Sequence, residues 1–107
     1  MMRKGKVFYK NILAGFVYQD DDGYGFSYDE DYLRSENPEP VSLTLPLTEE
    51  PYRAKTMLPF FDGLIPEGWL LTIAEKNWKL NANDRMGLLL AVCKDCIGAV
   101  HIEPIIE

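Results

Sequence analysis

The residues best suited to chemistry are two cysteines and the single histidine near the end of the chain. Cys93 and Cys96 form a C-x-x-C pair, and His101 follows five residues later. Structural zinc takes four protein ligands and catalytic zinc takes three plus a water, so these residues could supply at most three. A redox pair would need a thioredoxin-like βαβ unit, which the sequence pattern does not show. A small metal-binding or redox protein using Cys93, Cys96 and His101 stays open as an alternative. The structural interpretation is that the two cysteines are small thiols near a helix end.

Acidic residues offer the next candidates for chemistry. Carboxylates gather at residues 20–22 and 29–31. A calcium loop of the EF-hand type starting at the first of them would place Tyr24 at its fifth, ligand position, and strands would flank it instead of helices. Asp62 and Glu67 could act as acid and base, but nothing pairs them, and they suit a turn and a helix start. The sequence therefore predicts no catalytic residues, no cofactor and no metal site, and we expect a binding protein instead of an enzyme.

The composition fits one globular domain that spans residues 1–107. Hydrophobic residues make up 47% of the chain and charged residues 26%, as in ordinary globular proteins. The longest apolar run, residues 86–93, is too short to cross a membrane, and no long apolar segment follows the basic N-terminus, so we expect a cytoplasmic protein. The net charge of −6 disfavours direct contact with nucleic acid and suits a basic protein partner.

The first half of the chain alternates apolar and polar residues, as half-buried strands do. The expected strands are residues 6–10, 12–18, 24–28 and 41–45. Residues 29–40 are expected to form a loop with one helical turn around 31–34, and residues 48–56 a second loop. The first strands would pair as an antiparallel meander.

The pattern changes in the second half of the chain. Residues 59–65 are apolar, and Pro66 and Glu67 suit the first turn of a helix that is expected to run to about Lys79. A second helix is expected from Asn83 or Asp84 to about Cys93. A turn at 95–98 and a final strand at 99–102 would follow. These elements predict an α+β domain: an antiparallel β-meander or partial barrel from the N-terminal half plus a C-terminal strand, packed with two helices.

The first expected helix has an unusually wide apolar arc. At 100° per residue the arc covers about 200°, whereas an ordinary surface helix needs a stripe of about 100°. Trp69 and Trp78 lie near opposite edges of this arc. A partly exposed tryptophan is a favoured anchor of protein interfaces, and burial in the core is the alternative for both.

Several motifs together resemble one known family. They are GYGFSY at 23–28, PVSLTLPL at 40–47, LPFFDGLIPEGW at 58–69, GLLLAV at 87–92 and DCIGAV at 95–100. This series closely resembles the N-terminal subdomain of the HipA family of toxin kinases, over nearly the whole chain. Cys93 departs from the pattern, in which glycine is expected, and this departure makes the C-x-x-C pair look incidental.

The resemblance implies a function in binding. The ATP-binding and catalytic motifs of such kinases lie downstream of this subdomain, and none of them occurs here. A free-standing form resembles the HipS antitoxins of HipBST toxin–antitoxin systems. It would bind a HipT-like Ser/Thr kinase toxin and hold it inactive, with a HipB-like DNA-binding protein in a ternary complex. A further alternative is that the chain is a fragment of a longer kinase. We do not expect this, because the chain ends soon after its last expected strand.

The motif LPFFDGLIPEGW at 58–69 is the most specific of the five, and it supplies the expected partner-binding residues. They are Phe60, Phe61, Asp62, Leu64, Glu67, Gly68 and Trp69. We expect these residues to form the contact or to support it. Core packing is the alternative for Phe60, Phe61 and Leu64.

Overall fold

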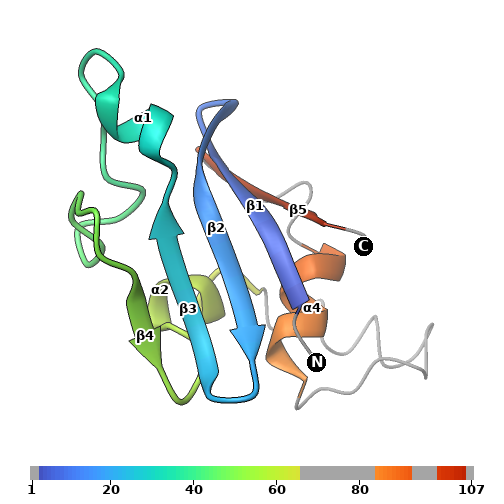
Figure 1. Ribbon diagram of the computed structural model, residues 1–107. Coiled ribbons are helices and arrows are strands. Elements are labelled where there is room, and N and C mark those ends of the chain that lie inside the picture. The colour runs from blue at the N-terminus through green and yellow to red at the C-terminus, as the bar shows by residue number, and fades with distance from the viewer. Residues whose placement is uncertain (1–2, 66–83, 93–98, 106–107) are drawn as a thin grey trace.

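The computed structural model describes residues 3–65, 84–92 and 99–105 (Figure 1). Within these ranges it contains five strands and three helices. They are β1 (Arg3–Tyr9), β2 (Ile12–Asp20), β3 (Gly23–Tyr28), α1 (Glu30–Arg34), β4 (Tyr52–Ala54), α2 (Pro59–Asp62), α4 (Arg85–Val92) and β5 (Val100–Pro104). The strands form one antiparallel sheet in the order β4-β3-β2-β1-β5. The predicted α+β class, with an open meander and a C-terminal strand, is confirmed.

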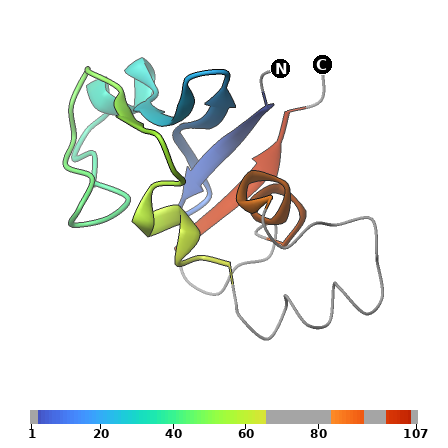
Figure 2. The same cartoon turned by 90° about the horizontal axis from the view of Figure 1, so that it is seen from below.

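The helices α2 and α4 cover one face of the sheet (Figure 2), and α1 follows the end of β3 (Figure 1). The core lies between the sheet and these two covering helices. Its fully buried side chains include Val7, Val17, Phe26 and Ile102 from the strands, and Phe61, Met86 and Leu89 from the helices. None of the helices in the described ranges is long and apolar enough to cross a membrane.

A bulge in β2 interrupts its pairing with β1. The pairing of β1 with β2 shifts between Val7 and Phe8, which leaves Ala14 as the extra residue of β2. A Cβ atom on Gly15 would lie 2.3 Å from the carbonyl oxygen of Ser27. Only glycine therefore lets β2 and β3 approach each other at this point.

The strand predicted at residues 41–45 is wrong. Ser42 and Leu45 form an isolated bridge across a tight turn, and the Leu45 N–H donates to the Ser42 carbonyl oxygen at 3.1 Å. The Tyr28 hydroxyl donates to the Leu45 carbonyl oxygen and accepts from the Val41 N–H. Because a side chain satisfies these backbone groups, they need no neighbouring strand.

The loop predicted at residues 48–56 is also wrong, because β4 lies inside it and pairs with β3. This strand has only three residues, too few for a visible alternation. The apolar stretch 59–65 contains the helix α2, which the sequence did not predict.

Other predicted elements agree with the structure. The helical turn around 31–34 corresponds to α1, the helix starting near Asp84 to α4, and the final strand to β5. The helix expected from Pro66 and the turn at 95–98 lie outside the described residues.

Candidate protein-binding site

The short helix α2 begins the most specific motif of the chain. Pro59 occupies its first turn and lacks the N–H that would be unsatisfied there. The Gly63 N–H donates to the Pro59 carbonyl oxygen at 2.9 Å and ends the helix, and a further turn leads to the buried Ile65. Residue 65 is the last described position before the stretch 66–83.

The two phenylalanines of α2 have different surroundings. Phe61 is fully buried, with its ring centroid 5.2 Å from that of Phe26 and 5.1 Å from that of Phe60. Phe60 is only partly buried at the edge of the core. Phe61 can therefore support a contact through packing, whereas part of Phe60 is accessible to a partner.

An ion pair joins α2 to α4. The Arg85 Nε donates to Asp62 Oδ1 at 2.5 Å, and both side chains are partly exposed. Asp62 is the last residue of α2, and Arg85 is the first of α4. The pair thus brings together the two described ends between which residues 66–83 run.

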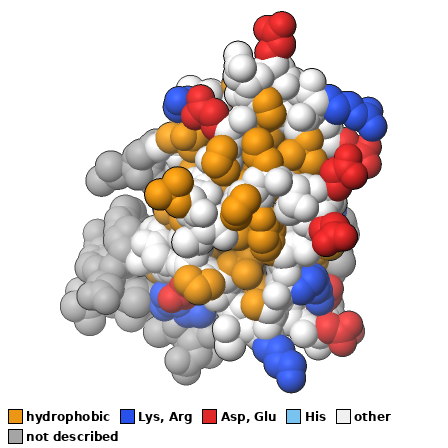
Figure 3. All heavy atoms as spheres, turned by 90° about the vertical axis from the view of Figure 1, so that its left-hand side faces the viewer, with side chains coloured by type: hydrophobic (Ala, Val, Ile, Leu, Met, Phe, Trp, Pro, Cys, Tyr) orange, Lys and Arg blue, Asp and Glu red, His pale blue; other side chains and the backbone are white. Residues whose placement is uncertain are grey.

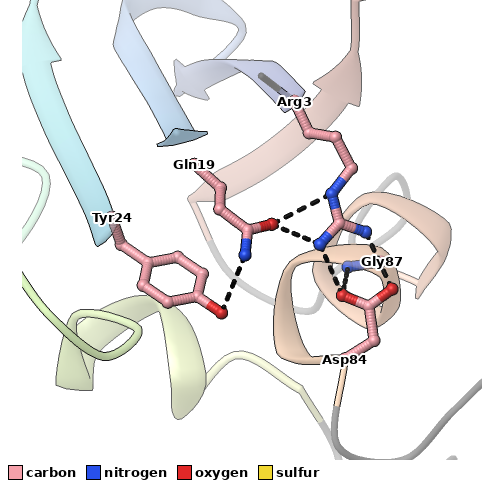
Figure 4. A network of polar contacts seen from close by, with 5 residues as sticks. All are labelled: Arg3, Gln19, Tyr24, Asp84 and Gly87. Carbon is pink, nitrogen blue, oxygen red and sulfur yellow. Dashed lines mark hydrogen bonds and ion pairs between the residues drawn. The ribbon is translucent and has the colours of Figure 1, made fainter. Parts of the chain in front are cut away.

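A second polar network fixes the start of α4 against the sheet (Figure 4). Arg3 in β1 donates to both carboxylate oxygens of Asp84, at 2.7 and 2.6 Å. It also donates to Gln19 Oε1, and Gln19 donates to the Tyr24 hydroxyl at 3.2 Å. Asp84 in turn accepts the Gly87 N–H at 3.2 Å and so caps the helix.

The same network shifts the ionisation of its members. Hydrogen bonds from the Arg3 guanidinium lower the pKa of Asp84 below its usual value, and burial opposes this effect. The hydrogen bond to Asp84 raises the pKa of Arg3. Both groups are therefore charged at neutral pH. We call Arg3, Asp62, Asp84 and Arg85 the α2–α4 frame.

The α2–α4 frame holds the described residues on either side of the stretch 66–83. This stretch contains three of the predicted site residues. Phe60, Phe61, Asp62 and Leu64 lie together in and directly after α2. Glu67, Gly68 and Trp69 lie outside the described residues. The sequence indicated Asp84 as a possible helix cap, but it gave no signal for Arg3, which is 81 residues away in the chain.

The metal or redox alternative finds no support in this arrangement. His101 lies in β5, where its ring stacks on Phe8 with centroids 4.7 Å apart. Cys93 and Cys96 lie outside the described residues. Among the residues that are described, no group of three His, Cys, Asp or Glu side chains could hold a metal ion.

A comparison with models of protein families agrees with the α+β fold of the chain. The model of the HipA N-terminal domain matches residues 5–103 of the chain. The chain belongs to the HipA N-terminal domain family. This HipA N-terminal domain resembles a solved structure described as the N-terminal domain of HipA toxin, with a TM-score of 0.76 and 28% identity. The match covers 98% of this chain and 94% of that one.

Two relatives carry the HipA N-terminal domain in different settings. An uncharacterised protein of Haemophilus influenzae is 33% identical over 103 residues, which are 96% of this chain and 93% of that protein. Y4mE of Sinorhizobium fredii, which is named as a kinase, is 36% identical over 100 residues. These cover 92% of this chain but only 24% of Y4mE. The same domain thus makes up nearly all of one relative and about a quarter of another.

Proposed function

We propose that this protein is an antitoxin that binds a HipT-like Ser/Thr kinase toxin in the cytoplasm and holds it inactive. It acts by contact and performs no catalysis itself. The observation that carries the proposal is the double occurrence of the domain, as nearly the whole Haemophilus protein and as a quarter of a protein named as a kinase. A domain that is fused to a kinase in one protein is suited to bind a kinase when it is separate.

The α2–α4 frame suggests how the contact is presented. Ile65, which is buried, and Asp84 are the described residues that flank the stretch 66–83. The Asp62–Arg85 ion pair holds these two flanking segments together, and the Arg3–Asp84 pair fixes Asp84 to the sheet. We infer that Glu67, Gly68 and Trp69 contact the kinase and that Phe60, Asp62 and Leu64 lie at the base of the contact. Fixed ends reduce the conformational entropy that is lost on binding.

Co-expression with a HipT-like kinase tests the proposal. We expect the chain to abolish the growth arrest that the kinase causes, and the two proteins to elute together on gel filtration. Persistent arrest without a complex would show that the proposal is wrong. A HipB-like DNA-binding protein is proposed as a third member, and adding its gene should shift the complex to a larger size.

Substitution of one tryptophan tests the proposed contact. We expect Trp69→Ala to weaken protection by the antitoxin, because a large aromatic anchor of an interface is removed. Trp78→Ala is the matched control, since it removes the same side chain from the opposite edge of the expected helix. Thermal unfolding of both variants separates lost binding from lost folding. Full protection by a folded Trp69→Ala variant would move the contact elsewhere.

A further inference from the structure

A second surface of the domain combines exposed hydrophobic side chains with a charged border. Figure 3 views the side on which α1, the loop of residues 35–51 and β4 lie, and it shows hydrophobic side chains gathered at the centre with charged ones around them. Leu43 in this loop is 95% exposed. Other hydrophobic residues of α1, this loop and β4 that are partly or fully exposed include Leu33, Pro46, Leu47 and Tyr52. We call these five residues the Leu43 surface.

The loop that displays Leu43 is held by tyrosine hydroxyls. Tyr28 bonds the backbone on both sides of Leu43, at Val41 and Leu45. The Tyr52 hydroxyl donates to the Pro46 carbonyl oxygen at 2.5 Å. A leucine on a loop held in this way loses little conformational entropy when a partner covers it. The loop is therefore suited to present an apolar anchor.

A third tyrosine holds the beginning of the same loop. The Tyr32 hydroxyl donates to the Glu39 carbonyl oxygen at 2.5 Å and accepts the Glu39 N–H at 3.2 Å. The Glu39 carboxylate pairs with Lys10 at 3.1 Å. The path of the loop is thus set at its start as well as around Leu43.

The segment that contains Leu43 is strongly acidic. Residues 29–50 contain seven acidic residues and one basic residue, a net charge of −6, and the whole chain also has a net charge of −6. The remaining residues contain ten acidic and ten basic residues and are neutral overall. Glu30 and Glu49 border a hollow of about 430 Å³ that is also lined by Leu33 and Arg34, and Arg34 lies 3.9 Å from Glu30. The surface thus has an apolar centre and a charged border, to which residues 29–50 contribute more acidic than basic residues, as protein interfaces often have an apolar centre and a polar rim.

We infer that the Leu43 surface is a second docking surface for the kinase, where Leu43 enters an apolar pocket surrounded by basic residues. The inference rests on the proposed function and adds a contact separate from residues 60–69. Leu43 is almost fully exposed on a loop that is held in place, which suits an apolar anchor, and the excess of acidic residues at 29–50 favours a basic counterpart through charge complementarity. This contact gives the PVSLTLPL motif at 40–47 a function in binding, in addition to forming the turn around Leu43.

Calorimetric titration of the chain with the purified kinase tests this inference. Leu43→Ser should weaken binding at least about tenfold, or about 1.4 kcal/mol, because a leucine that becomes buried in the complex is lost. Ile12→Ser is the matched control, since Ile12 is also exposed, at 59%, but lies outside the Leu43 surface. Its affinity should stay unchanged. Because both side chains are exposed, neither variant should lose stability.

Charge reversal supplies an independent readout. Glu49→Lys should weaken binding about threefold or more, and the difference from wild type should shrink at high salt, where charges are screened. Glu103→Lys in β5 makes the same charge change elsewhere and should have little effect. If wild type binds the kinase but Leu43→Ser and Glu49→Lys bind equally well, the second surface is wrong while the proposed function stands. If wild type does not bind the kinase, the proposed function itself fails.

Discussion

The Arg3–Asp84 pair makes the strongest test of how the domain is held together. It joins the first strand to the first turn of α4, across 81 positions of the chain. Asp84→Ala removes both the ion pair with Arg3 and the cap on the Gly87 N–H. Asp84→Ser keeps a side-chain oxygen that can cap the helix but removes the charge. Comparing the two variants separates the contribution of the cap from that of the ion pair.

The expected magnitudes follow from the exposure of the pair. Loss of a helix cap costs about 1 kcal/mol. The side chains of Arg3 and Asp84 are 33% and 37% exposed, so solvent screens their attraction and the pair contributes about 1 kcal/mol at most. Asp84→Ala should therefore lower the free energy of unfolding by about 2 kcal/mol, and Asp84→Ser by about 1 kcal/mol. For a domain of this size, a loss of 2 kcal/mol lowers Tm by roughly 10 °C.

Urea denaturation of a double-mutant cycle measures the pair directly. We expect Arg3→Ala and Asp84→Ala to show a coupling energy of about 1 kcal/mol. Arg34→Ala is the control, because its 3.9 Å pair with Glu30 is highly exposed and should contribute less than about 0.5 kcal/mol. Additive effects of Arg3→Ala and Asp84→Ala would contradict this prediction, since they would mean that the pair does not stabilise the fold.

Two further predictions concern the polar contacts of the fold. Tyr28→Phe should lower the free energy of unfolding in urea by about 2–3 kcal/mol, because it leaves two buried backbone groups without partners. Tyr52→Phe, at an exposed site, should lower it by less than about 1 kcal/mol. Equal losses would mean that the Tyr28 hydroxyl does not hold the loop. Arg3 lowers the pKa of Asp84 from its ordinary 3.8. The stability that ionised Asp84 contributes is therefore present above about pH 4 and is lost as the pH falls through the folded-state pKa. The difference in free energy of unfolding between wild type and Asp84→Ser should shrink from about pH 7 to about pH 3, and a constant difference would contradict the lowered pKa.

Much of the sheet could be predicted because local patterns determine it. The strands expected at 6–10, 12–18 and 24–28 alternate because one face is buried, and the structure pairs the corresponding strands β1, β2 and β3 as a meander. The start of α4 could also be predicted, since Asp84 is a good cap. These features depend on neighbours in the sequence.

The errors arise where distant side chains replace local backbone pairing. Residues 41–45 alternate like a strand, but the Tyr28 hydroxyl bonds Val41 and Leu45 and leaves the segment as a turn. For the same reason the sequence could not show that Leu43 is almost fully exposed. Arg3 likewise belongs to the α2–α4 frame only because β1 lies beside the start of α4, a proximity that no local pattern contains.

The phosphorylation activity of a purified HipT-like kinase is the most direct test of the proposed antitoxin function. The kinase is titrated with this chain, and the transfer of phosphate from ATP is measured at each ratio. We expect the activity to fall to near zero at about one chain per kinase. Full kinase activity in the presence of a large excess of folded chain would contradict it.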